Sequence, residues 1–94
     1  MRKLKQTAAF KRDFKRETKG PHRKYLFENL ETLIQSLAKD EPLEVRHRDH
    51  PLGGEWKDHR DCHVRPDLVL IYRKPSDDTL HLVRLGSHSE LFKK

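Results

Sequence analysis

The sequence predicts one α+β domain, residues 1–94, whose elements follow the order β-α-α-β-β-β. Three observations favour this fold class. Apolar residues recur at helical spacing in the first 40 residues, an unalternating apolar run follows at Leu68–Tyr72, and the turn formers Pro75-Ser76-Asp77-Asp78 separate that run from a last strand. Helices that precede a meander of strands are typical of α+β domains. A chain of 94 residues is long enough for a single hydrophobic core.

A short edge strand and a helix are expected first. Residues 2–6 alternate weakly, and their lysines would protect an exposed strand edge from aggregation. Thr7 is a suitable N-cap, and Phe10 and Phe14, four residues apart, give the following helix one apolar face. Gly20-Pro21 ends this helix.

A second helix is predicted from about His22 to Lys39. Its broad apolar stripe, which we interpret as core, consists of Leu26, Phe27, Leu30, Leu33, Ile34 and Leu37. Asp40-Glu41-Pro42 closes the helix, because proline cannot continue it. The very short link between the two helices predicts an antiparallel helical hairpin.

Residues 44–54 are loop-like, and a strand with one polar face is predicted to follow them. Trp56, Cys62 and Val64 share one parity of this strand. The other parity is polar and carries Lys57, His59, Asp61, His63 and Arg65.

Two more strands complete the predicted sheet. Pro66-Asp67 forms a turn before the run 68–72, which has the composition of a central strand covered on both faces. The last strand spans Thr79–Leu85. The facing of Arg84 is ambiguous, because it shares parity with Leu80 and Leu82.

The formal net charge of +6 is concentrated in the N-terminal third of the chain. Residues 1–24 carry ten lysines and arginines against two acids. Such an excess favours polyanionic partners, which it attracts by electrostatic steering and by release of condensed counterions. The alternative interpretation is a basic helix face that is merely solvated.

Cysteine usage and hydropathy predict a cytoplasmic protein. The single cysteine, Cys62, cannot form an intrachain disulfide, which suits a reducing compartment. No apolar segment of signal-peptide length follows the charged N-terminus. The longest apolar run is far too short to span a bilayer, so no membrane partner is expected.

The histidines are the main candidates for chemistry. His59 and His63 have a zinc-like spacing, but on a strand they would lie about 13 Å apart, too far to share one metal. A metal-binding triad drawn from His50, His63, Asp67 and His88 stays open as an alternative. Cys62 is interpreted as a small core residue. Without a metal, several imidazoles, a carboxylate and an arginine can cleave RNA, since imidazole both gives and accepts protons near neutral pH.

Several separated motifs follow one another along the chain. They are Asp49-His50-Pro51-Leu52-x-Gly54-x-Trp56-Lys57, Arg60-Asp61-x-His63-Val64-x-Pro66-Asp67, Ile71-Tyr72 and Arg84-x-Gly86-Ser87-His88-x-x-Leu91-Phe92. In order and spacing they closely resemble the YafQ toxins, a histidine-rich branch of the RelE superfamily of bacterial toxin–antitoxin mRNA interferases. The match covers about half the chain. It implies a small curved antiparallel sheet packed against the N-terminal helical hairpin, with the active site on the open side of the sheet.

The resemblance also implies a function. Members of the family are toxins of type II toxin–antitoxin systems, endoribonucleases that cut translated mRNA in the ribosomal A site without a metal or other cofactor. The expected partners are therefore mRNA, the ribosome with its rRNA, and a cognate antitoxin that wraps and inactivates the toxin. Contact with DNA is expected only indirectly, through the antitoxin complex.

Carried onto the matching positions, the resemblance implies catalytic roles for His50, His63, Asp67, Arg84 and His88. Substrate contacts are expected from Phe92, Arg46, Arg48 and Lys57. Contacts to the antitoxin or to rRNA are expected from Lys11, Arg12, Lys15 and Arg16. Trp56 also matches, but a buried core role is expected for it.

His88 is the expected general acid for the leaving 5′-oxygen, reached through a flexible Gly86-Ser87 approach. Asp67 is expected to act as the base or to orient a histidine, and His50 and His63 remain further candidates for the base. Arg84 suits the transition-state charge, because it never loses its proton. Two other functions stay open: a catalytically silent module that binds RNA, DNA or an antitoxin, and a metal-dependent nuclease.

Overall fold

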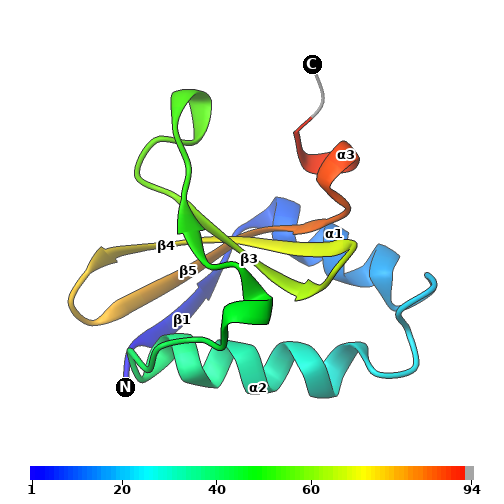
Figure 1. The fold of residues 1–94 in the computed structure, drawn as a ribbon, viewed down its shortest axis with the longest axis horizontal. Helices are drawn as coiled ribbons and strands as arrows, with labels where there is room; N and C mark the ends of the chain where they lie inside the picture. The colour runs from blue at the N-terminus through cyan, green and yellow to red at the C-terminus, as the bar shows by residue number, and fades with distance from the viewer. Residues whose placement is uncertain (93–94) are drawn as a thin grey trace.

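The computed structural model describes residues 1–92, which form an α+β fold built on a five-stranded sheet (Figure 1). The strands, in the order in which they neighbour one another, are β1 (Lys3–Gln6), β5 (Thr79–Gly86), β4 (Leu68–Ser76), β3 (Arg60–Arg65) and β2 (His50–Pro51). Strands β2 to β5 pair antiparallel, as expected. The expectation of a wholly antiparallel sheet is wrong for β1, which pairs parallel to β5. Two helices follow β1, so no hairpin turn constrains its direction.

The two long helices are α1 (Ala8–Glu17) and α2 (Leu26–Ala38), which run in opposite directions in Figure 1. The predicted N-cap of α1 is confirmed, since the Thr7 hydroxyl accepts a hydrogen bond from the Phe10 amide at 2.9 Å. Helix α2 begins at Leu26, later than the predicted start at His22. The polar segment before Leu26 has no apolar face to bury and forms turns instead.

The hydrophobic core fills the space between the helices and one face of the sheet. It contains Phe10 of α1, the buried leucines of α2, and Leu68, Leu70 and Tyr72 of β4. A second, smaller cluster covers the opposite face, where Val69 and Ile71 pack with Leu91 and with half-buried Trp56 and Phe92. Residues 68–72 are thus buried on both faces, which confirms their prediction as a central strand.

Strand β3 starts at Arg60 and not near Trp56, as the parity pattern had predicted. Trp56 ends a short 3₁₀ helix, Gly54–Trp56, and Asp58 adopts a left-handed backbone with φ 69°. A residue in that conformation interrupts an extended strand. The segment between β2 and β3 therefore rises above the sheet on the side opposite α2 (Figure 1).

A β-bulge decides which way Arg84 faces. Tyr72 lies opposite Leu82 and Ile71 lies opposite Arg84, so Val83 is the extra residue on β5. Because residues directly opposite each other share a face, Arg84 lies on the face of Ile71 and the second cluster. The bulge removes the ambiguity that strict alternation had left.

After β5 the chain forms a short helix, α3 (His88–Leu91), on the side of the sheet opposite α2 (Figure 1). Gly86-Ser87, expected to be a flexible approach to His88, takes part in the N-terminal cap of α3. The Ser87 hydroxyl accepts from the Glu90 amide at 3.2 Å, and the Glu90 carboxylate accepts from the Ser87 amide at 2.9 Å. This reciprocal capping box fixes the start of α3. Among residues 1–92, no helix is long and apolar enough to cross a bilayer.

Candidate active site

The pairing of the strands aligns most of the candidate residues in two neighbouring rows on the second-cluster face. In the first row His50 of β2 lies opposite Asp61 of β3, Asp61 lies opposite Ile71, and Ile71 lies opposite Arg84. The second row runs from His63 of β3 through Val69 of β4 to Gly86 of β5. His88 follows Gly86 by two residues, at the start of α3. Two sequence segments far apart thus meet on one face of the sheet.

Asp61 lies beneath this cluster, with a side chain only 3% exposed. Burial raises the pKa of its carboxyl group, and the nearby charges of His50, His63 and His88 act in the opposite direction. The carboxylate is therefore within electrostatic reach of three imidazoles. Its Oδ1 atom is buried without a hydrogen bond in the part of the chain that the structure describes. An ionisable group held in this way is a common feature of catalytic sites.

Asp61 is the residue that sequence reasoning placed on the polar face but did not select. The available signal was its position two residues before His63, which on a strand puts both side chains on one face. Alternation did not predict its burial beside β2, where His50 lies opposite it.

His50 and His63 are held in the same tautomer by backbone carbonyls. Nδ1 of His50 donates to the Arg48 carbonyl at 2.6 Å, and Nδ1 of His63 donates to the Pro66 carbonyl at 3.1 Å. A carbonyl oxygen can only accept, so in each ring Nδ1 carries a proton. In the neutral imidazole the other nitrogen, Nε2, is then free to accept a proton. His50 Nδ1 also lies 3.2 Å from Asp61 Oδ1.

The position of His50 depends on its neighbour Asp49. The Tyr72 hydroxyl donates to Asp49 Oδ1 at 2.5 Å, and Arg60 Nε donates to the same oxygen at 3.2 Å. Burial, together with the Asp49 carboxylate, raises the pKa of Tyr72, so the phenol keeps its proton and remains a donor. These bonds attach the short strand β2 to β3 and β4.

His88 and Phe92 form an aromatic edge to the site. Their ring centroids are 4.6 Å apart, and Phe92 in turn meets Trp56 edge-on at 6.2 Å. His88 is exposed, whereas Phe92 is half-buried. Trp56, expected in the core, is half-buried and packs against the second, smaller core cluster. An exposed imidazole thus stands beside a partly covered ring.

Arg84 is held by Asp13 of α1. Its Nε donates to Asp13 Oδ2 at 2.6 Å and its Nη2 donates to Oδ1 at 3.1 Å. This two-point contact leaves Nη1 without a bond to Asp13, and the side chain remains 30% exposed. Asp13 raises the pKa of Arg84 further, so the cation is permanent. No local sequence pattern indicates Asp13 as the partner of Arg84.

The structure does not bring Asp67 into contact with the three imidazoles around Asp61. Asp67 lies on the turn between β3 and β4, with its side chain 73% exposed. Its Oδ1 is 2.9 Å from Nε2 of His22, in the segment that joins α1 to α2. The turn still contributes to the site through Pro66, whose carbonyl orients His63.

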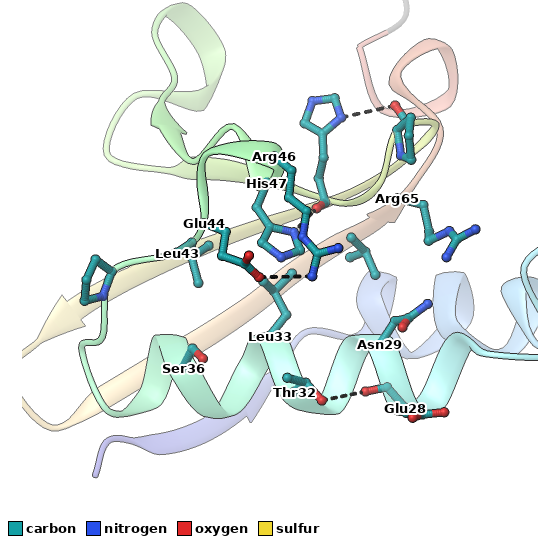
Figure 2. Close-up of a pocket in the computed structure, with 14 residues that line it drawn as sticks. Glu28, Asn29, Thr32, Leu33, Ser36, Leu43, Glu44, Arg46, His47 and Arg65 are labelled. Atoms are coloured by element: carbon teal, nitrogen blue, oxygen red, sulfur yellow. Dashed lines mark hydrogen bonds and ion pairs between the residues drawn. The ribbon is translucent and has the colours of Figure 1, made fainter.

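Arg46 lines a pocket of about 420 Å³ between α2 and residues 42–47, on the opposite side of the sheet from α3 (Figures 1 and 2). Figure 2 shows Arg46 and His47 above Leu33 and Asn29 of α2. Arg46 pairs with Glu44 at 3.0 Å. His63 is the one predicted catalytic residue on its lining.

The other predicted contact residues differ in their exposure and in their ion pairs within the molecule. Lys57 and Arg48 are exposed, and Arg48 has a left-handed backbone with φ 46°. Lys11, Arg12 and Lys15 are exposed on α1. Arg16 is bound within the molecule, to Asp13 at 3.0 Å and Glu17 at 3.1 Å.

Comparison with known proteins agrees with this geometry. A family model described as the bacterial toxin YafQ of type II toxin–antitoxin systems matches residues 2–93. The mRNA interferase toxin YafQ of Escherichia coli strain K12 is 51% identical over 51 residues, which are 54% of this chain and 54% of the relative. The chain therefore spans about half the length of the curated relative that it matches.

Solved structures extend the likeness over the whole fold. The YafQ chain in the E. coli DinJ–YafQ complex is 35% identical, with a TM-score of 0.83 over 98% of this chain and 99% of that one. A metal-bound toxin from Helicobacter pylori is 41% identical, with a TM-score of 0.84 over 98% and 100%. Both the family model and the folds cover nearly the full chain, and this protein therefore belongs to the YafQ family of bacterial toxins of type II toxin–antitoxin systems.

Proposed function

We propose that this protein is an endoribonuclease that cleaves translated mRNA in the ribosomal A site by acid–base catalysis without a metal. The observation that carries the proposal is the convergence of His50, His63 and His88 around buried Asp61, with Arg84 at the end of the same row. Cleavage of an RNA phosphodiester needs a base, an acid and a cation, and these residues supply all three.

His63 or His50 acts as the general base. Each ring keeps its Nδ1 proton on a backbone carbonyl, so Nε2 is available to remove the proton of the ribose 2′-hydroxyl. The 2′-oxygen then forms a bond to phosphorus. When His50 becomes a cation, the carboxylate of Asp61, 3.2 Å from its Nδ1, stabilises the charge.

His88 acts as the general acid. As the bond from phosphorus to the 5′-oxygen breaks, His88 gives its proton to that oxygen, and the products are a 2′,3′-cyclic phosphate and a 5′-hydroxyl. The free Nη1 of Arg84 faces the negative charge that develops on the phosphorane oxygens. Phe92, next to His88, offers a ring on which a base or ribose can stack.

The proposed role of Asp67 is to orient other residues of the site. Its pair with His22 supports the turn that carries the Pro66 carbonyl, and that carbonyl sets the tautomer of His63. This arrangement favours an orienting role for Asp67 over a role as the base.

Whether cleavage requires a metal ion can be tested directly. Within residues 1–92 no three His, Cys, Asp or Glu side chains are grouped so that they could hold a metal ion. A relative from H. pylori, however, has been crystallised with a metal bound. Chelator treatment therefore distinguishes the two types of nuclease.

The ribosome, its rRNA and a cognate antitoxin are the proposed partners, and the cytoplasm, where mRNA is translated, is the proposed location. The E. coli relative forms a complex with DinJ, which supports an antitoxin here. The exposed basic face of α1, formed by Lys11, Arg12 and Lys15, suits either rRNA or an acidic antitoxin segment.

Mapping of mRNA 5′ ends after brief expression tests the proposed function. We expect growth to stop and new 5′ ends to appear inside translated messages, and both effects to be absent with His88→Ala. Growth arrest without new 5′ ends would instead support a silent module that acts only by binding.

A further inference from the structure

Helix α1 takes the place of a strand along the end of β5. Strand β1 pairs with β5 only as far as Leu82, so within residues 1–92 the edge of β5 beyond Leu82 has no neighbouring strand. Side chains of α1 and its cap occupy this edge instead. The Thr7 hydroxyl donates to the Val83 carbonyl at 2.7 Å, and Arg16 Nη2 donates to the Leu85 carbonyl at 2.8 Å. The bulged end of β5, which carries Arg84, is therefore attached to α1.

Asp13 is the centre of this contact. It is 3% exposed, and its carboxylate accepts four hydrogen bonds, two from Arg84, one from Arg16 and one from the Leu85 amide. Burial is the largest single influence and raises the pKa of Asp13. The bonds from Arg84 and Leu85, with the charges of both arginines, outweigh it and leave the pKa below its usual value. Asp13 is therefore a buried, ionised carboxylate.

The same carboxylate is linked to α3. Arg16 donates to Asp13 at 3.0 Å, and its Nε lies 3.6 Å from Oε2 of Glu90. Glu90 caps α3 by accepting from the Ser87 amide. Gly86 makes room for this link, because a Cβ atom there would lie 2.8 Å from Arg16 Nη2 and 3.2 Å from Glu90 Oε1. A continuous set of ionic contacts thus runs from Arg84 through Asp13 and Arg16 to the helix that carries His88.

We propose that Asp13 is a positioning residue for the cleavage reaction. It fixes the guanidinium of Arg84 so that Nη1 faces the scissile phosphate, and through Arg16 and Glu90 it fixes the helix that carries His88. Asp13 touches neither the substrate nor the reacting atoms. The inference rests on the proposed function, in which Arg84 and His88 take part in cleavage.

The first test measures the position of Arg84 without reference to cleavage. In a ¹H–¹⁵N spectrum of the free protein, the Nε–H of Arg84 should be protected from exchange with water, because it donates to a buried carboxylate at 2.6 Å. Asp13→Asn should abolish this protection. Asp40→Asn is the control, since Asp40 also pairs with two cations, Arg2 and Lys74, but is exposed. Persistence of the protected signal in Asp13→Asn would overturn the proposal.

The second test separates positioning from folding. Single-turnover cleavage on programmed ribosomes at saturation, corrected for the folded fraction by circular dichroism, should be slower for Asp13→Asn by about 10- to 100-fold. The half-saturating concentration should change much less. In an Arg84→Gln background the same substitution should slow cleavage much less, because the two residues act together. Equal fold losses in both backgrounds would mean that Asp13 does not act through Arg84, and would overturn the proposal.

A second variant covers the case in which Asp13→Asn fails to fold. Arg16→Gln leaves Asp13 to hold Arg84 but removes the link to Glu90, so cleavage should slow while the Arg84 Nε–H signal stays protected. An unchanged rate would overturn the link to α3. If Arg84→Gln itself cleaves at the wild-type rate, the proposed catalytic role of Arg84 is wrong, whereas the spectrum still reports whether Asp13 positions it.

Discussion

His50 lies directly opposite Asp61 across strands β2 and β3, with its Nδ1 3.2 Å from the Asp61 Oδ1 atom. The imidazole is half-exposed, at 50% of its side-chain surface, and the carboxylate is buried. At this distance a negative charge on Asp61 attracts a proton-bearing imidazole directly. The pair therefore suits a histidine that gains and loses a proton during a reaction.

Asp61→Asn should stabilise the fold and slow cleavage. Burial raises the folded-state pKa of Asp61 above its unfolded value, so the ionised carboxylate costs stability at any pH above the folded pKa. The neutral amide removes that cost. We therefore expect a higher Tm at neutral pH, with a difference that shrinks as pH falls below the unfolded pKa, where both states are protonated. A thermal melt at several pH values measures this.

Asp77→Asn, at an exposed turn, is the control and should change neither Tm nor rate. A lower Tm for Asp61→Asn at neutral pH, or cleavage at the wild-type rate, would contradict the role given to Asp61.

His88→Ala should slow cleavage by about 10²–10⁴-fold, the usual contribution of a general acid, and leave binding to the ribosome largely unchanged. Single-turnover cleavage measures the rate, and circular dichroism measures the folded fraction. His81→Ala is a matched control, because His81 lies near the start of β5, opposite Arg73, whereas His88 follows the other end of that strand. If His88→Ala lowered the Tm but the folded protein still cleaved at the wild-type rate, the role of His88 would be limited to the packing of α3.

Cleavage should survive EDTA and leave a 2′,3′-cyclic phosphate with a 5′-hydroxyl, because the proposed acid, base and cation are all side chains. Treatment of the products with polynucleotide kinase and ATP identifies the 5′-hydroxyl, since only that end accepts a phosphate. Activity that disappears in EDTA and returns with zinc or magnesium would instead support a metal-dependent nuclease.

Replacing Lys11, Arg12 and Lys15 with serine should weaken antitoxin binding and make it less sensitive to salt, because exposed charges interact through a screened field. Titration calorimetry at two salt concentrations measures both effects. A variant in which Lys3, Lys5 and Lys39 are replaced removes the same charge elsewhere and is the control. Equal losses for the two variants would show that only net charge matters.

Much of the fold was predictable because its signals are local. The Thr7 cap, the apolar stripe of α2 and the doubly buried run 68–72 each depend on residues close in sequence. The capping box of Ser87 and Glu90, three residues apart in the sequence, is likewise a local signal, and it marks the start of α3. The parallel pairing of β1 was not predictable, since no turn connects it to β5.

The candidate site was predictable only in part. Alternation placed His63 and Asp61 on one face, but burial of Asp61 depends on segments that fold over it. The facing of Arg84 depends on a bulge at Val83, which strict alternation cannot reveal. Its partner Asp13 lies 71 residues earlier in the chain, and no local pattern connects two residues so far apart.

We propose that the ribosome presents mRNA to the histidine cluster for cleavage, and a comparison of one mRNA in two states tests this most directly. Purified protein is mixed with the message either free or bound to ribosomes with the A site empty, and the initial cleavage rates are measured. We predict rapid cleavage within the A-site codon of bound message, little cleavage of free message, and neither with His88→Ala. Equal rates on free and bound mRNA, or cleavage that His88→Ala leaves unchanged, would contradict it.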